Sequence, residues 1–251
     1  MSQVSIVMPV YNAARYIEDT LRSILRQTMG DFEVVIADDG TTDASLDMAA
    51  GFADPRIRIL RHATNTGITA ALNRGICASR SPYIALCAAD DLLTPDSLAL
   101  RLAHVRPSDS LICGQAPNIA AATTLADVDR YPPLPPETLQ VFYGPTILMP
   151  RTTFERYGLF DEALSYKVDR EMWVRLFGRA KMRTDRGTFT CLAAILGYYR
   201  VRPDSFQQTY KTLPAMNRDA VENQFNARVV AHTFTTAGLP HLPPLAPPDG
   251  V

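Results

Sequence analysis

Short apolar runs alternate with amphipathic stretches along the first 114 residues of the chain. The runs are too short for helices and are bounded by turn or acidic residues, which is typical of buried strands. They lie at residues 4–10, 32–37, 57–60, 83–88 and 110–113. Apolar spacing and capping residues predict helices between them, at 15–26, 42–52, 69–78 and 94–105, caps included. This alternation predicts βαβ units, and therefore an α/β protein with a mostly parallel sheet flanked by helices.

The pattern changes after Gly114. Residues 115–136 are rich in Ala, Thr and Pro and predict an exposed linker with little regular structure. Beyond it, the sequence predicts a turn at 143–145, strands at 146–149 and 192–199, and helices at 152–157, 169–177 and 213–236. The Pro-rich end, residues 239–251, predicts a disordered tail.

Composition narrows the class of protein. With 251 residues and 47% hydrophobic content, the chain can bury a large core. The net charge is −1 and the charges are interleaved, so nothing indicates a nucleic-acid partner. The four cysteines lie far apart, which favours reduced thiols over disulfides or a zinc site. No apolar run reaches membrane-spanning length, so we expect a cytoplasmic protein, with contact at the inner face of the membrane left open.

Polar residues follow three of the predicted strands. Tyr11 and Asn12 come after the first strand, Asp38 and Asp39 after the second, and Asp90-Asp91 after the fourth. Parallel strands end at a common edge, where open α/β sheets bind ligands. An acid there can accept hydrogen bonds from a nucleobase or ribose, and an aromatic ring can stack on a base. The pattern therefore predicts a nucleotide site at this edge.

The adjacent carboxylates of Asp90 and Asp91 repel each other, which a divalent cation placed between them and a polyphosphate would offset. Asp91 could instead orient its neighbour or cap the following helix. An isolated acidic pair is usually a solvated turn, but the repeated placement at strand ends favours ligand roles. The chain has no Gly-x-Gly-x-x-Gly turn and no Walker lysine, which disfavours dinucleotide-binding and P-loop proteins.

Five segments carry a resemblance to a known family. They are Ser-Ile-Val-Met-Pro-Val-Tyr-Asn at 5–12, Asp-Asp-Gly-Thr-Thr-Asp at 38–43, Asn-Thr-Gly-Ile-Thr-Ala-Ala-Leu-Asn at 65–73, Phe-Asp-Glu at 160–162 with Asp-Arg-Glu-Met-Trp-Val-Arg-Leu at 169–176, and Tyr-Arg-Val-Arg-Pro-Asp-Ser at 199–205. In combination they resemble the family-2 glycosyltransferases of GT-A fold over residues 4–205.

The resemblance implies a GT-A (Rossmann-like) domain that moves a single sugar, with inversion, from a nucleoside-diphosphate sugar to an acceptor hydroxyl. The acceptor would be a glycan or lipid-linked molecule in surface polysaccharide, O-antigen or glycolipid synthesis. Residues 1–114 would form the donor-binding half and 115–212 the acceptor and catalytic-base half, followed by a terminal helix at 213–238 and a tail at 239–251. The Gln-x-x-Arg-Trp signature of processive synthases is absent, which favours addition of one sugar.

The resemblance also implies roles for individual residues. Asp169 would be the catalytic base, and Asp90 would hold Mn²⁺ or Mg²⁺. The residues implied to bind the nucleotide sugar are Pro9, Tyr11, Asn12, Asp38, Asp39, Gly67, Asn73, Asp90, Asp91 and Arg202. The chemistry agrees, because inversion by single displacement needs one base and the diphosphate needs charge neutralisation. Arg202 replaces a histidine common in the family and could also face the diphosphate.

Two departures from the family pattern leave alternatives open. Ala88 stands where the family has the first acid of its Asp-x-Asp, and Val168 stands where it has a glutamate. A non-catalytic nucleotide-sugar-binding protein with a degenerate metal site is therefore one alternative. A nucleotidyltransferase on a similar sheet is another, although it would need a glycine-rich, basic loop after the first strand, which this chain lacks.

Two segments of the chain indicate possible binding partners. The basic residues at 179, 181, 183 and 186 predict a solvated face and leave peripheral contact with anionic lipid headgroups open. The helix predicted at 213–236 is expected to pack on the core or on a second copy, which leaves a homodimer open.

Overall fold

The computed structural model describes residues 2–130, 132, 144–164, 167–177, 188–203, 220, 222–228, 239–240 and 242. Ten strands form a seven-stranded and a three-stranded sheet within these residues. In the order β3-β2-β1-β4-β8-β6-β9, the larger sheet contains β3 (Ile57–Leu60), β2 (Phe32–Asp38), β1 (Val4–Val10), β4 (Tyr83–Leu86), β8 (Leu148–Pro150), β6 (Asp109–Gln115) and β9 (Thr188–Ile195). The smaller sheet, in the order β5-β10-β7, contains β5 (Leu92–Leu93), β10 (Gly197–Val201) and β7 (Asn118–Ala120).

The larger sheet is mostly parallel, as predicted. β1 pairs in parallel with β2 on one side and with β4 on the other, and only β8 runs antiparallel to its neighbours. Every residue of β2 is buried. A strand buried on both faces is the expected result of a continuous apolar run in a parallel sheet.

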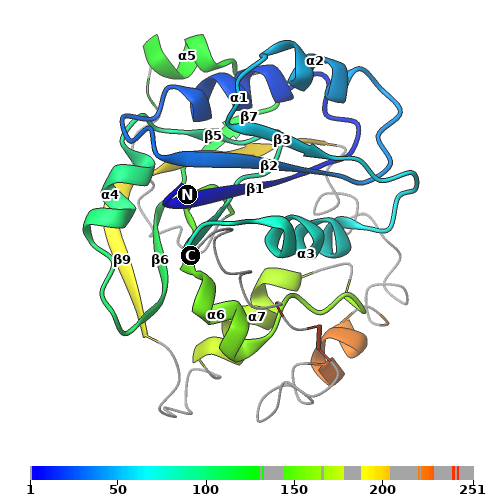
Figure 1. Ribbon diagram of the computed structural model, residues 1–251, viewed down its shortest axis with the longest axis vertical. Helices are drawn as coiled ribbons and strands as arrows, with labels where there is room; N and C mark the ends of the chain where they lie inside the picture. The colour runs from blue at the N-terminus through cyan, green and yellow to red at the C-terminus, as the bar shows by residue number, and fades with distance from the viewer. Residues whose placement is uncertain are drawn as a thin grey trace, which may run out of the picture.

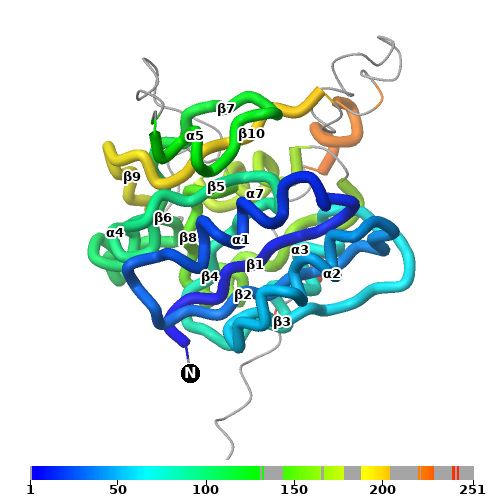
Figure 2. Tube along the Cα trace, turned by 90° about the horizontal axis from the view of Figure 1, so that it is seen from above, coloured from blue at the N-terminus to red at the C-terminus, as the bar shows by residue number. Residues whose placement is uncertain are grey.

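Helices cover both faces of this sheet (Figure 1). On one face lie α1 (Ile17–Leu25) and α2 (Ser45–Gly51), and on the other lie α3 (Ile68–Ala78), α6 (Arg151–Tyr157) and α7 (Val168–Phe177). The short helix α5 (Leu125–Arg130) packs on the smaller sheet, beside α1. A further helix, α4 (Ser97–Ala103), precedes β6, and a short 3-10 turn spans Gly144–Thr146. Figure 2 shows β7, β10 and α5 at the end of the molecule away from β3 and α2.

The alternation of side chains along β1 divides the core between the two faces. Ile6 and Met8 belong to the cluster that includes the buried face of α1. Val7 belongs to the cluster that includes Ile76 of α3 and Phe154 of α6. One strand thus contributes to two hydrophobic layers, which is why it can hold the helices of both faces in place.

The prediction of little regular structure over residues 115–136 is wrong where the structure describes this region. β7 pairs in parallel with β10, and α5 buries Leu125 and Val128 against Leu92 and Tyr198. These contacts join segments that are far apart in sequence, so local composition gave no sign of them. Of this region, residue 131 and residues 133–136 lie outside the described residues.

The single late strand predicted at 192–199 is in fact two strands. β9 pairs with β6 in the larger sheet, whereas β10 pairs with β5 and β7 in the smaller one. Between them, Leu196 is fully buried and donates its backbone N–H to the carbonyl of Gln115. The chain therefore changes sheets at Leu196 without any break in its apolar character.

Two predicted C-terminal segments are described only in part. Residues 220 and 222–228 of the predicted 213–236 helix are helical, and the rest lie outside the described residues. From the tail, Leu239 and Leu242 are buried, and the N–H of Leu159 donates to the carbonyl of Pro240 at 2.9 Å. The basic residues at 179, 181, 183 and 186 lie outside the described part.

Two findings concern membranes and thiols. None of the described helices combines the length and apolar character needed to cross a bilayer. The four cysteines are all free thiols, and Cys87 and Cys113 are buried.

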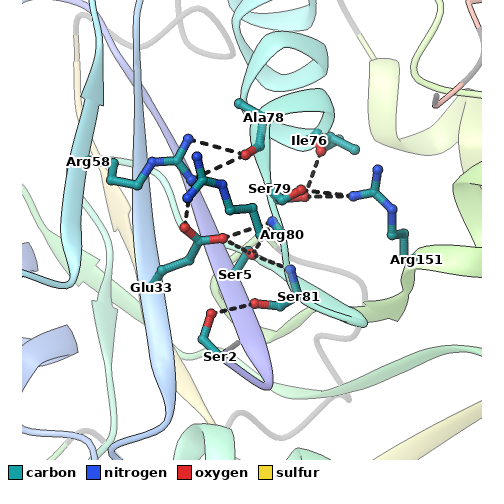
Figure 3. A network of polar contacts seen from close by, with 10 residues as sticks. All are labelled: Ser2, Ser5, Glu33, Arg58, Ile76, Ala78, Ser79, Arg80, Ser81 and Arg151. Carbon is teal, nitrogen blue, oxygen red and sulfur yellow. Dashed lines mark hydrogen bonds and ion pairs between the residues drawn. The ribbon is translucent and has the colours of Figure 1, made fainter. Parts of the chain in front are cut away.

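A polar network ties β1, β2 and β3 to the C-terminal end of α3 (Figure 3). Glu33 lies at its centre and accepts hydrogen bonds from Ser5 Oγ at 2.6 Å, the backbone N–H of Arg80 at 2.9 Å and Arg58 Nη1 at 2.7 Å. Arg58 also donates to the carbonyl of Ala78, where the end of α3 favours a cation. Burial raises the pKa of Glu33, but these hydrogen bonds and the Arg58 charge outweigh it and leave the pKa lowered.

We predict that Glu33→Gln lowers the free energy of unfolding by about 2 kcal/mol at neutral pH, because the amide cannot replace a charged acceptor facing Arg58. Since the folded-state pKa is lowered, this stabilisation is present above the unfolded pKa of about 4.3 and is lost as the pH falls through the folded value. Urea unfolding at neutral and acidic pH checks both points. Glu18→Gln, in the exposed pair with Arg22, is the control and should change stability by under about 0.5 kcal/mol.

Candidate functional site

The strands β1, β2 and β4 end side by side at one edge of the sheet. The register pairs Val10 with Asp38, and the N–H of Asp39 donates to the carbonyl of Val10 at 2.9 Å. On the other side of β1, the N–H of Cys87 donates to the carbonyl of Val7 at 3.1 Å. The predicted residues after these three strands therefore start from adjacent strand ends, where α/β sheets bind ligands.

Asp38 and Asp39 are buried and hold the loops around the site. Asp38 accepts the backbone N–H of Thr41 at 2.9 Å and that of His62 at 3.2 Å. Asp39, whose side chain is 4% exposed, accepts the N–H groups of Thr66 and Gly67, both at 2.9 Å. These carboxylates therefore shape the 40–43 and 62–67 loops.

Asp39 also pairs with Arg74 of α3 at 3.1 Å. Burial raises the pKa of the Asp39 carboxyl, but the hydrogen bonds from Thr66, Gly67 and Arg74 outweigh it and leave the pKa lowered. The group is therefore charged at neutral pH, and its charge is used within the protein.

Tyr11 presents an open aromatic surface at this edge, since it is 52% exposed. Asn12 has a positive φ of 48°, and its Oδ1 accepts the N–H of Thr42 at 2.9 Å, so it fixes the turn beside Tyr11. Gly67 has a φ of 95°, a conformation that glycine adopts without strain. Pro9 lies within β1 and is partly exposed.

Asn73, which the sequence predicts to bind the nucleotide sugar, has backbone partners within the protein. It is 3% exposed and belongs to α3. Its Nδ2 donates to the carbonyl of Phe160 at 2.9 Å, and its Oδ1 accepts the N–H of Phe160 at 3.0 Å. The side chain therefore joins α3 to the 160–162 segment.

The turn after β4 carries a charged cluster. Asp91 is 1% exposed and accepts the N–H of Arg200 at 2.9 Å. Burial, and then the charge of Asp90, raise the pKa of Asp91 well above its usual value. Asp90 is nearer to solvent, with its side chain 17% exposed, and its Oδ2 lies 2.7 Å from Nε of Arg202.

Arg200 and Tyr16 complete this cluster. Arg200 is buried, and its Nε donates to the carbonyl of Asp90 at 2.7 Å. Its Nη1 donates to the carbonyl of Ala120, the last residue of β7, and to those of Ala121 and Thr123 in the loop that follows. The guanidinium carbons of Arg200 and Arg202 lie 5.1 and 5.3 Å from the centre of the Tyr16 ring, within cation–π range.

Neither Tyr16 nor Arg200 was assigned a role from the sequence. Two arginines separated by one residue at the end of a strand share a face, and that spacing was the available signal for Arg200. Tyr16 precedes α1 and meets them only through tertiary packing.

Asp169 lies in the first turn of α7, on the α3 face of the sheet (Figure 1). The carbonyl of Leu164 accepts a 2.8 Å hydrogen bond from Thr69 Oγ1, which fixes the segment before α7 against the start of α3. The Asp169 carboxylate is solvent-exposed and accepts the N–H of Arg170 at 2.8 Å. Desolvation by neighbouring protein atoms raises the pKa of this carboxyl. An exposed carboxylate with a raised pKa can accept a proton.

The residues of the β4 turn do not form a metal site as they are arranged. Ala88 has no ligand atom, Asp91 is directed into the protein, and Asp90 is paired with Arg202. No cluster of three or more His, Cys, Asp or Glu side chains suited to a metal ion occurs among the described residues.

The sequence profile described as Glycosyl transferase family 2 matches residues 5–163. Over 248 residues, the chain is 31% identical to the uncharacterized glycosyltransferase EpsJ of Bacillus subtilis. This match covers 90% of this chain and 68% of EpsJ. It is 27% identical to the uncharacterized glycosyltransferase RP339 of Rickettsia prowazekii, over 69% of this chain and 58% of that protein.

Two solved structures show the same fold. S. aureus TarS 1–349 in complex with UDP matches with a TM-score of 0.64 and 16% identity, over 91% of this chain and 72% of that one. The mannosyltransferase PcManGT from Pyrobaculum calidifontis, in complex with GDP-Man and Mn²⁺, matches with a TM-score of 0.63 and 18% identity. That match covers 92% of this chain and 69% of PcManGT.

We predict that Asp39→Asn lowers the free energy of unfolding by about 2 kcal/mol without any ligand present, because the amide places N–H donors against the N–H groups of the 66–67 loop. Chemical denaturation of the ligand-free protein measures this. Asp47→Asn, at an exposed position in α2, is the control and should leave stability nearly unchanged. Equal stability of the two variants would show that Asp39 does not support the loop.

Proposed function

The chain belongs to glycosyl transferase family 2 and has the GT-A fold, and from this premise we propose that it transfers a single sugar, with inversion, from a nucleoside-diphosphate sugar to an acceptor hydroxyl. The observation that carries the proposal is the meeting of β1, β2 and β4 at one edge. This edge combines an exposed aromatic ring at Tyr11 with a cationic side chain at Arg202.

The donor class follows from this combination. Tyr11 can stack on a nucleobase, and an arginine can bind a diphosphate through two N–H groups. Structures with the same fold contain such molecules, since TarS is described with UDP and UDP-GlcNAc and PcManGT with GDP-Man. Gly67 and the buried Asp38 and Asp39 support the loops at the same edge.

Asp169 is the proposed catalytic base. Its carboxylate takes the proton of the acceptor hydroxyl while that oxygen attacks the anomeric carbon of the donor. The bond from the anomeric carbon to the diphosphate breaks with its electron pair remaining on the diphosphate. The new glycosidic bond forms on the opposite side, so the configuration inverts.

The leaving diphosphate needs positive charge. The sequence-based hypothesis is a divalent cation, Mn²⁺ or Mg²⁺, held by Asp90, and PcManGT is described with Mn²⁺. Around Asp90 of this chain, however, the residues do not fit such an ion well, because Ala88 replaces a ligand and Arg202 pairs with the remaining carboxylate.

We further propose that residues 1–114 hold the donor and 115–212 the acceptor, a glycan or lipid-linked molecule at the cytoplasmic face of a membrane. A role in surface polysaccharide, O-antigen or glycolipid synthesis fits this acceptor class. A nucleotide-sugar-binding protein without catalysis is the second candidate, because Ala88 and Val168 replace two acids of the family pattern.

Product analysis separates these two candidates. We expect the protein, given UDP-, GDP-, dTDP- and CMP-sugars with a mixture of glycan and lipid-linked acceptors, to release the nucleotide from one donor and to form one glycoside. A true donor should also raise the melting temperature, because a ligand that binds the folded state stabilises it. A donor that binds and is never consumed would favour the non-catalytic candidate.

We predict that Asp169→Asn lowers kcat by about 100-fold or more, whereas the affinity for the nucleotide stays within about threefold, because the amide cannot take a proton. In the unmodified protein, activity should fall as the pH drops through the pKa of Asp169, which desolvation places above the ordinary value of about 3.9. Asp127→Asn, at an exposed position, is the matched control. Full activity of Asp169→Asn would refute its assignment as the base.

A further inference from the structure

We propose that Arg202, rather than a divalent cation, neutralises the diphosphate of the donor in this protein, and that Asp90 serves to hold Arg202. This inference rests on the proposed function, because it concerns how the strand-end site binds its donor. It starts from the ion pair in which Asp90 Oδ2 and Arg202 Nε lie 2.7 Å apart.

The first step concerns the side chains of the β4 turn that could bind a metal ion. Mg²⁺ and Mn²⁺ bind carboxylate oxygens, usually together with the phosphates of the substrate. In the β4 turn, the Asp91 carboxylate accepts the N–H of Arg200 and is 1% exposed, and residue 88 is alanine. Of the carboxylates in this turn, only that of Asp90 is partly exposed, and it is already paired with the guanidinium of Arg202. A metal ion would have to displace Arg202 and would then be repelled by it.

The second step is the way the protein fixes Arg202. The Tyr16 ring supports its guanidinium at 5.3 Å, beside that of Arg200 at 5.1 Å. Arg200 in turn donates to the backbone carbonyl of Asp90 at 2.7 Å, so it fixes the backbone that carries the carboxylate, while the Tyr16 ring supports both guanidinium groups. Arg200 is thus a positioning residue for the Asp90–Arg202 pair.

The third step is access and geometry. The Arg202 side chain is 22% exposed, so a ligand at the strand ends can reach it. A guanidinium carries five N–H donors in a plane and binds phosphate oxygens in pairs. Held by Asp90 through Nε, the guanidinium can bridge a carboxylate and a diphosphate, which is the arrangement that a bound metal ion would otherwise provide.

The two mechanisms predict opposite effects of Asp90→Asn. If Asp90 holds a metal, the amide loses the ion and the nucleotide binds more weakly. If Asp90 holds Arg202 through the ion pair, the amide oxygen of the variant can still contact the guanidinium, and removal of the negative charge removes a repulsion toward the diphosphate. Nucleotide affinity in the absence of metal should then be unchanged or higher.

Calorimetric titration with UDP and GDP, in EDTA and then in Mn²⁺, tests the inference. We expect at least one nucleotide to bind in EDTA with an affinity within about threefold of that in Mn²⁺. Arg202→Gln should weaken that binding by about tenfold or more, Arg202→Lys by less, and Asp90→Asn should not weaken it. Arg22→Gln, in an exposed pair on α1, is the control and should bind as the unmodified protein does.

A variant that adds ligands gives an independent readout. Ala88→Asp combined with Arg202→His supplies a second carboxylate and an imidazole, so it should bind Mn²⁺ more tightly than the unmodified protein in electron paramagnetic resonance titrations with UDP present. Melting curves without ligand confirm that each variant is folded.

The outcomes separate this inference from the proposed function. Binding that requires Mn²⁺ and is lost in Asp90→Asn would overturn the inference and leave the proposed transfer intact. Failure of UDP, GDP and dTDP, titrated in the same way, to bind under either condition would overturn both. Binding in EDTA that depends on Arg202 and survives Asp90→Asn would support the inference and, for the proposed function, the donor class.

Discussion

The parallel hydrogen bonding of β1 to β2 on one side and to β4 on the other is the constraint on which the rest of the structure depends. Parallel strands must all leave the sheet at the same edge, so the segments after them are brought together whatever their sequences are. The same pairing buries β1 on both faces and requires helices above and below it (Figure 1). Fold and site location are thus consequences of one register.

At that edge the acidic residues divide into two groups. Asp38, Asp39 and Asp91 are buried and accept backbone N–H groups, so these hydrogen bonds hold loops in place. Asp90 is nearer to solvent and has a side chain that a ligand can reach, and Asp169, which lies in α7 on the α3 face of the sheet, is also exposed. A short motif of adjacent acids therefore contains both structural and accessible carboxylates, and only their burial and partners distinguish them.

The regular part of the fold could be predicted from the sequence because it depends on local periodicity. The five strands predicted up to residue 113 and the helices between them are where the apolar pattern predicts them, within a few residues. β5, β7 and β10 were missed or misjudged because they are short and exist only through pairing between distant segments. No short stretch of the sequence shows such pairing, because the paired segments lie far apart in the chain.

The candidate site, like the fold, could be predicted from the sequence only in part. Its location followed from the residues after the strands, whereas the side-chain roles depended on contacts that no motif reveals. Asn73 binds the 160–162 segment, and Arg202 pairs with the acid predicted to hold a metal. Tyr16 and Arg200 were missed because they act through packing, with one aromatic ring supporting two guanidinium groups.

A crystal structure of the protein with UDP bound would test the central claim most directly, namely that the common edge of β1, β2 and β4 is the nucleotide site. The account predicts uracil against Tyr11 and the diphosphate within hydrogen-bonding distance of Arg202. UDP bound elsewhere would contradict it, for example in the hollow between α1 and α2 that is lined by Arg22, Met48 and Phe52.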